Sequence, residues 1–334
     1  MNARIAQVLL RPQLGGAETL VAGLDREFAS RGMSTSVAYL EPDGNARSPG
    51  QRVKELRSQL KAFGPTHVLG HSALPNIYAR LASPRGIGVT CVLHSASDDF
   101  ANPTLRLAEW ALLARTHAVI AVSATAHRQY ASRFPNRHRV HTVNNGVSPA
   151  FHPATRPSRE PTRLISVARV ADQKNPAVWR RVTELAAVAM PQLSFDWWGP
   201  ATDPDHMAAV AAHNASSSNS SFRGPTQQAS AELRGADIFL HTADAEANSI
   251  VLLEAAASGL PIICSQSVST TVPDHIQVTS FRTGDAEDCL ASIARVCGDW
   301  GTQCAQAAAN QRHVAENFTI AAVADRYLDI MGIA

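Results

Sequence analysis

Long apolar runs and paired cysteines are both missing from this chain of 334 residues. Its longest apolar stretches, such as 118–122 and 260–264, are far below the ~20 residues that a membrane-spanning helix needs. The five cysteines include no Cys-x-x-Cys pair, and their odd number argues against a complete disulfide framework. We therefore expect no transmembrane helix, no structural disulfide and no structural metal site.

An export signal is also lacking. Residues 1–4 run directly into the strand-like segment 5–10, without an apolar signal core or a small-residue cleavage site. We expect no Asp-x-Asp motif of the kind that binds a metal with a nucleotide, and no cluster of histidine and cysteine has the spacing of metal ligands. These absences predict a cytoplasmic protein whose activity needs neither a metal ion nor another cofactor.

Lysine is scarce, with 3 lysines against 27 arginines. The net charge is only +2, yet residues 1–150 carry +8 and residues 151–334 carry −6. A basic first half suits an anionic membrane, such as the inner membrane face, or a phosphate-bearing acceptor, although solvated helix faces would give the same pattern. We expect no nucleic acid partner. The candidate docking surface is a helix face that carries Arg52, Lys54, Arg57 and Lys61.

Short β-branched runs recur along the whole chain and alternate with amphipathic stretches. This pattern is typical of βαβ units around a mainly parallel sheet, and the chain is longer than one hydrophobic core usually supports. We therefore predict an α/β protein with two Rossmann-like domains and a crevice between them. The expected strands are Ile5–Leu10, Ser34–Leu40, Thr66–His71, Val89–His94, Ala118–Ser123 and Arg139–Val143, then Arg163–Ala168, Ser194–Trp198, Ser221–Arg223, Asp237–His241, Pro261–Ser265 and Val278–Phe281.

A segment with four prolines and no periodicity, 148–161, is typical of an interdomain linker. We accordingly expect a first domain at 1–147 and a second domain at 162–315. The remaining residues, 316–334, are predicted to form a helix that packs back on the first domain.

Two glycines, Gly15 and Gly16, stand between the first strand and the helix that follows it. Glycines at this place let the backbone approach a ligand and leave free N–H groups for an anion, but they also serve as a simple turn and packing device. The third glycine of Gly-x-Gly-x-x-Gly is missing, which removes the main support for a dehydrogenase.

Two cations follow the first strand of the second domain, Arg169 at its carboxyl end and Lys174 in the next loop. A lysine here is an exception in an arginine-rich chain, and a compact ammonium suits a diphosphate. A solvated surface pair is the alternative.

The strongest pattern is a pair of carboxylates, Glu246 and Glu254, eight positions apart. On one helix they would share a face ~12 Å apart, a span that suits the two ends of a nucleotide sugar. The N–H groups of Asn248, Ser249 and Ile250 are expected at the helix start, where the helix dipole favours a diphosphate. An exposed helix with two chance glutamates is the alternative.

In combination, these motifs resemble the GT-B glycosyltransferases of family 4, over nearly the whole chain. The resemblance implies two Rossmann-like domains that face each other across a cleft, an acceptor domain at 1–147 and a donor-nucleotide domain at 162–315. It also implies a retaining transfer of a sugar from a nucleotide-diphosphate sugar, of UDP or GDP type, to a hydroxyl acceptor that is a glycan, a lipid-linked molecule or a small molecule. The matching residues are Gly15-Gly16-Ala17-Glu18, Asn145-Gly146-Val147 with Phe151 and Pro153, Arg169 with Lys174, and Glu246 through Glu254 to Pro261.

The resemblance also implies roles for the donor-site residues. Arg169 and Lys174 would neutralise the donor diphosphate, Glu246 would touch the transferred sugar, and Glu254 would hold the ribose. By the same resemblance, no metal takes part in the chemistry.

The resemblance further assigns residues of the first domain. Gly15 and Gly16 would line the phosphates from the other side. A histidine is expected at the end of a first-domain strand, where His94 matches best and His71 is a second candidate. A structural, hydrogen-bonded histidine is the alternative for either one.

Some residues depart from the family pattern. His241-Thr242 replaces a frequent Pro-Ser before the first glutamate, and 265–274 lacks the glycines and glutamate of many relatives. Two rival functions stay open. One is another GT-B enzyme on a nucleotide sugar, such as an epimerase or phosphorylase, and the other is a two-lobed sugar-binding protein without catalysis, against which the missing export signal and the cation pair both argue.

Overall fold

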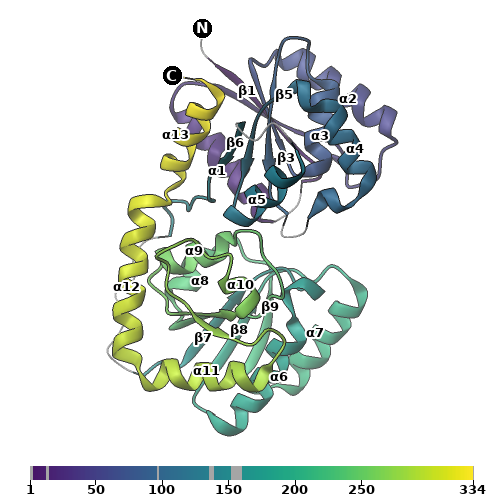
Figure 1. Ribbon diagram of the computed structural model, residues 1–334. Helices are drawn as coiled ribbons and strands as arrows, with labels where there is room; N and C mark the ends of the chain where they lie inside the picture. The colour runs from purple at the N-terminus through teal and green to yellow at the C-terminus, as the bar shows by residue number, and fades with distance from the viewer. Residues whose placement is uncertain (1–2, 13–14, 96–97, 135–138, 152–159, 334) are drawn as a thin grey trace. The chain divides into compact units, whose positions relative to one another are not determined.

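The computed structural model describes residues 3–12, 15–95, 98–134, 139–151 and 160–333 (Figure 1). The chain divides into two compact units. Unit 1 holds Met1–Gly146 and Ile320–Ala334, and unit 2 holds Val147–Thr319. Much of the predicted linker, residues 152–159, lies outside the described residues. The predicted end of the second domain at 315 falls inside a helix that continues to Asn317, so the chain enters unit 1 later than expected.

Unit 1 is a parallel sheet of six strands in the order β2-β1-β3-β4-β5-β6. Strands that are buried on both faces of such a sheet are apolar without alternation, as in β4, where all five residues are buried. The elements are β1 (Arg4–Leu9), α1 (Gly16–Ser30), β2 (Ser34–Tyr39), α2 (Pro49–Phe63), β3 (His67–His71), α3 (Ala73–Ala82), β4 (Val89–Leu93), α4 (Pro103–Leu112), β5 (Thr116–Ala121), α5 (Ala124–Arg133), β6 (Val140–Thr142) and α13 (Ile320–Met331).

Unit 2 repeats this plan with the strand order β12-β11-β10-β7-β8-β9, again all parallel. Its elements are β7 (Arg163–Val167), α6 (Pro176–Ala189), β8 (Ser194–Trp198), α7 (Pro204–Ser216), β9 (Ser220–Gly224), α8 (Ala229–Arg234), β10 (Ile238–His241), α9 (Ile250–Ala257), β11 (Ile262–Ser265), α10 (Gln266–Ser269), β12 (Thr279–Phe281), α11 (Ala286–Gly298) and α12 (Trp300–Asn317).

The predicted fold class is confirmed, because all twelve expected strands are present and no strand end is displaced by more than two residues. In the described part of the chain, no helix is at once long enough and apolar enough to cross a membrane.

The last helix, α13, belongs to unit 1 and packs against α1. A Cβ atom on Gly23 of α1 would lie 2.9 Å from the side chain of Ile320, so a glycine is needed for this close approach. The Arg31 guanidinium donates to the carbonyl oxygen of Ala321 at 3.0 Å, and it is also paired with Asp325. These contacts attach the end of the chain to its first domain.

The strand order reverses at one place in each sheet. In unit 2 the first strand, β7, lies between β8 and β10, so the chain leaves β7 and β10 toward opposite sides of the sheet. In α/β sheets, ligands bind at such a switch point, beyond the carboxyl ends of the strands. The fold therefore brings the segments after β7 and β10 together, and these segments carry Lys174 and Glu246.

Candidate functional site

The loops that follow β7 and β10 are joined by backbone and side-chain hydrogen bonds. The Asp244 N–H donates to the carbonyl oxygen of Gln173 at 2.9 Å, and the Gln173 side-chain amide donates to that of Ala245 at 2.7 Å. The Thr242 hydroxyl donates to the carbonyl oxygen of Lys174 at 2.9 Å. Because both loops are fixed to each other, the positions of Lys174 and of the residues after Thr242 are set together.

The centre of the site is a carboxylate held by two donors. One oxygen of Glu246, Oε1, is paired with the Lys174 ammonium and lies 2.8 Å from Nε2 of His241. The exposed fractions of these side chains are 12% for Glu246, 17% for Lys174 and 2% for His241. Burial alone would raise the pKa of Glu246, but the hydrogen bond and charge of His241, with those of Lys174, lower it to about 2. Glu246 is therefore an anion at every physiological pH.

The predicted placement of both carboxylates on one helical face is wrong. The helix, α9, begins only at Ile250, with Ser249 as its N-cap, so Glu246 lies in the loop before it and Glu254 lies inside it. Glu246 is held by Lys174 and His241 instead of by helical hydrogen bonds. Of the three residues expected at the helix start, Ser249 is the N-cap, Ile250 is the first helical residue, and Asn248 lies one residue before the N-cap, so a role of the Asn248 N–H group in donor binding stays a prediction. The unpaired N–H groups at this end belong to Ile250 and the next residues.

Glu254 is buried in α9, with 8% of its surface exposed. Among the described residues, no hydrogen-bond donor or cation is recorded for its carboxylate. Burial raises the pKa of this group to about 7. A buried carboxyl without a partner costs stability when it ionises, and a ligand with hydroxyl donors would offset that cost.

Because of the Glu254 carboxyl group, the protein is expected to become less stable as pH rises. A folded-state pKa raised from 4.5 to about 7 means that the folded state binds the proton more tightly, so stability is lost as pH rises from 4.5 to 7. The free energy of unfolding is expected to be about 3 kcal/mol lower at pH 8 than below pH 4.5 as a result of this group. Glu254→Gln is expected to remove this difference, which denaturant unfolding at pH 4 and pH 8 would measure. Glu184→Gln, an exposed glutamate of unit 2, serves as the control. An unchanged pH dependence in Glu254→Gln would contradict the assignment.

Arg169 lies two residues after the end of β7 and is exposed. Within the described residues, no acceptor or acid is recorded for its guanidinium, so this charge is available to a ligand. The backbone beside it is tightly packed, because a Cβ on Gly199 would lie 1.8 Å from the carbonyl oxygen of Ala168, and Gly199 has φ +151°. Only glycine permits this approach of the β7 and β8 ends.

In unit 1, Gly15 is the N-cap of α1 and Gly16 is its first residue. A Cβ on Gly15 would lie 2.6 Å from Oε2 of Glu18, so the glycine leaves room for that carboxylate at the start of the helix. An acid at a helix N-terminus is favoured by the helix dipole, and a phosphate there would compete with Glu18. A phosphate-binding role of the two glycines stays a prediction.

Both histidine candidates of unit 1 lie together. Nδ1 of His71 is 3.1 Å from Nε2 of His94, and Nε2 of His71 is 3.2 Å from the side-chain oxygen of Gln7. Burial lowers the pKa of His94 to about 4, and burial with the nearby His94 lowers the pKa of His71 well below its usual value. Both rings are therefore neutral at pH 7. His94 is the more exposed of the two, since His71 is only 1% exposed.

The basic face predicted on α2 is smaller than expected. Arg52 is paired with the buried carboxylate of Glu41 and lies over the ring of Tyr78, 5.4 Å from its centroid. Its side chain is only 15% exposed. Sequence reasoning missed this contact because Glu41 precedes the helix. Lys54, Arg57 and Lys61 do lie at the surface.

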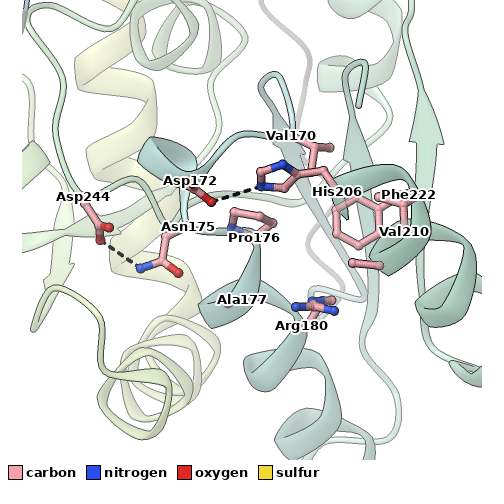
Figure 2. A pocket seen from close by; sticks show the side chains of 11 residues that line it. Val170, Asp172, Asn175, Pro176, Ala177, Arg180, His206, Val210, Phe222 and Asp244 are labelled. Carbon is pink, nitrogen blue, oxygen red and sulfur yellow. Dashed lines mark hydrogen bonds and ion pairs between the residues drawn. The ribbon is translucent and has the colours of Figure 1, made fainter. Parts of the chain in front are cut away.

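Unit 2 also has a hollow of about 190 Å³ beside the first turns of α6 and α7. Figure 2 shows that Asp172 points toward His206 and Asn175 toward Asp244. Oδ1 of Asp172 lies 3.2 Å from Nε2 of His206, and the Asn175 side-chain amide donates to the Asp244 carboxylate. None of the predicted site residues lines this hollow. The expectation that the chain has no Asp-x-Asp motif is wrong, because Asp203 and Asp205 have this spacing. The Asp203 carboxylate caps α7 and accepts from the Asp205 N–H at 2.9 Å.

Comparison with known proteins adds family information to this geometry. Residues 14–151 match the family model described as Glycosyltransferase Family 4, and residues 161–299 match the one described as Glycosyl transferases group 1. No curated protein sequence matches the chain.

Similar solved structures share the fold. HepE from Anabaena, in complex with UDP and glucose, is 15% identical with a TM-score of 0.81, and 99% of each chain is covered. Sucrose-phosphate synthase from Thermosynechococcus elongatus is 16% identical with a TM-score of 0.79, and 100% of each chain is covered. The lipopolysaccharide outer core galactosyltransferase WaaB is 16% identical with a TM-score of 0.69, over 98% of this chain and 99% of that chain.

Proposed function

Because the chain belongs to the family 4 glycosyltransferases of the GT-B fold, we propose that it transfers a sugar from a nucleotide-diphosphate sugar to a hydroxyl acceptor with retention of configuration. The observation that carries this proposal is the pairing of Lys174 with Glu246 at the switch point of unit 2. Lys174 lies in the segment after β7, and Glu246 lies in the loop that leads from β10 into α9. A diphosphate needs cations and N–H donors, whereas a sugar needs a fixed acceptor for its hydroxyl groups.

In this proposal each residue meets one part of the donor. Lys174, Arg169 and the first N–H groups of α9 meet the charge that grows on the leaving diphosphate, and each charge-assisted hydrogen bond contributes roughly 1.5–3 kcal/mol. Glu246 holds a sugar hydroxyl, and Glu254 holds the ribose. The acceptor hydroxyl attacks from the face that the diphosphate leaves. The donor is of UDP or GDP type, and unit 1, with His94, binds the acceptor.

A panel of UDP and GDP sugars tests the proposal. The enzyme is incubated with each donor, with and without hydroxyl acceptors, and the free nucleoside diphosphate and the anomeric proton of the product are followed by chromatography and NMR. A product with the anomeric configuration of the donor supports the proposal. Isomerised donor without release of nucleotide would indicate an epimerase, and binding without any turnover would indicate a sugar-binding protein.

We propose further that the reaction needs no metal ion, because cationic side chains and helix N–H groups supply the positive charge that a metal would bring. Turnover is expected to stay within about twofold when excess EDTA is added. A metal ion that took part would be the largest local charge in the site, so its removal would lower turnover strongly. The same assay measures this. Loss of turnover with EDTA that Mg²⁺ or Mn²⁺ restores would contradict it.

We also propose that unit 1 docks on an anionic membrane surface, at the cytoplasmic side, through helices α2, α3 and α4. These helices pack in sequence, α2 on α3 and α3 on α4 (Figure 1). Leu107 and Trp110 of α4 are 72% and 47% exposed, and Leu81 of α3 is 38% exposed. Arg57 of α2 donates to the carbonyl oxygen of Leu81, which places a cation beside this exposed leucine. Exposed aromatic and aliphatic side chains next to cations match the interface of an anionic bilayer.

Sedimentation with phosphatidylcholine vesicles, with and without phosphatidylglycerol, tests the docking. Binding is expected only with phosphatidylglycerol, and Leu107→Ser with Trp110→Ser is expected to weaken it about tenfold or more because two apolar side chains lose their burial. Val188→Ser, at a site 88% exposed in unit 2, is the matched control. Binding to both kinds of vesicle alike, or to neither, would contradict the docking.

A further inference from the structure

The His241 side chain is held more firmly than those of Lys174 and Glu246. It ends β10, which is paired on one side with β7 and on the other with β11, where His241 faces Cys264. Its side chain is 2% exposed, and its ring stacks on that of Phe239 with 5.9 Å between centroids and 22° between planes. A ring held in this way has little freedom to turn.

The direction of the hydrogen bond follows from the charges. Glu246 carries no proton, so its Oε1 can only accept, and Nε2 of His241, 2.8 Å away, must carry the donated proton. The Lys174 ammonium donates to the same oxygen. Among the described residues, no donor is recorded for the second oxygen, Oε2.

We propose that His241 is a positioning residue, which holds Oε1 of Glu246 in place so that Oε2 alone is presented to a hydroxyl group of the donor sugar. This inference rests on the proposed function and deepens it. Because its side chain is 2% exposed, His241 acts on the ligand through Glu246 and not by direct contact. The sugar that binds must offer a hydroxyl as donor, because an ionised carboxylate oxygen can only accept.

Lys174 and His241 differ once a donor is bound. The lysine has a long, flexible side chain and is asked to meet the diphosphate, so its contact with Glu246 is shared. His241 has no second task and keeps its hydrogen bond. The positioning of Glu246 in the donor complex therefore depends on His241. The loss of His241 is expected to weaken the contact to the sugar and to leave the binding of the nucleotide unchanged.

Calorimetry with UDP and with UDP-glucose, beside the turnover assay and melting curves, tests this inference. His241→Leu is expected to bind UDP within about twofold of wild type, but to bind UDP-glucose and to turn it over about tenfold less well, since the loss of one fixed contact to the sugar is felt only when the sugar is present. His241→Gln, whose amide nitrogen takes the place of Nε2, is expected to restore most of the loss.

The matched control is His213→Leu, which removes another buried histidine of unit 2. That ring is bonded to Ser220 at 2.8 Å and takes no part in the site. His213→Leu is expected to bind both ligands like wild type. Equal losses for UDP and UDP-glucose in His241→Leu, or no loss for either, would overturn the positioning role while leaving the proposed function intact. A wild-type protein that binds neither UDP nor GDP, and none of the UDP and GDP sugars of the panel, would instead contradict the proposed function.

Discussion

Glu246→Ala is expected to abolish sugar transfer, with a fall in turnover of about 10²-fold or more, while the nucleoside diphosphate binds nearly as before. A group that acts on the sugar in the transition state affects the chemical step and leaves the binding of the nucleotide alone. The structure adds a second expectation. Removing Glu246 frees the Lys174 ammonium from its ion pair, so the affinity for a diphosphate stays equal or rises.

Calorimetry with the nucleoside diphosphate and the product assay measure the two effects of Glu246→Ala separately. Glu246→Gln keeps the shape of the side chain and removes its charge, and it is expected to lose most of the turnover as well. Glu184→Ala, at an exposed position of unit 2, is the control for a lost carboxylate. Near-normal transfer by Glu246→Ala would show that the sugar lies elsewhere.

Lys174→Met is expected to have the opposite effect, because it weakens the binding of the nucleoside diphosphate itself. The loss of one charge-assisted contact in a partly buried place corresponds to about 10-fold to 100-fold in affinity. The lysine side chain is 17% exposed, so in the variant water replaces the lost contact to the diphosphate only in part. The same substitution leaves Glu246 with His241 as its remaining partner, and some loss of melting temperature is expected.

The matched control for Lys174→Met is Lys61→Met, which removes an exposed lysine of α2. Calorimetry is again the measurement, repeated at low and high salt, because a contact between charges weakens with ionic strength. Lys174→Met with the diphosphate affinity of wild type would contradict the donor site. The double variant Lys174→Met with Glu246→Gln is expected to melt higher than Lys174→Met alone, since it removes the buried charge that has lost its partner.

The strands were predictable because a parallel sheet is buried on both faces, and its strands are short apolar runs with polar ends. Lys174 stood out because lysine is rare in this chain. The start of α9 was expected at Asn248 to Ile250, and the structure has Ser249 as the N-cap and Ile250 as the first helical residue. The pattern of two glutamates eight apart was fitted to a helix, and only the structure shows that a loop carries the first.

Other features of the site depend on contacts between distant segments, which local sequence patterns do not contain. The bond of His241 to Glu246 needs a loop that turns back on its own strand. The pairing of Arg52 with Glu41 turned a predicted surface cation inward. The closeness of His71 and His94 follows from the pairing of β3 with β4, which places the two strand ends side by side.

A crystal structure with a bound nucleotide sugar tests the central claim most directly. The account predicts the diphosphate against Lys174, Arg169 and the first turn of α9, a ribose hydroxyl on Glu254, and a sugar hydroxyl on Oε2 of Glu246. A donor seated away from these residues, such as in the hollow that Asp172 and His206 help to line, would contradict it.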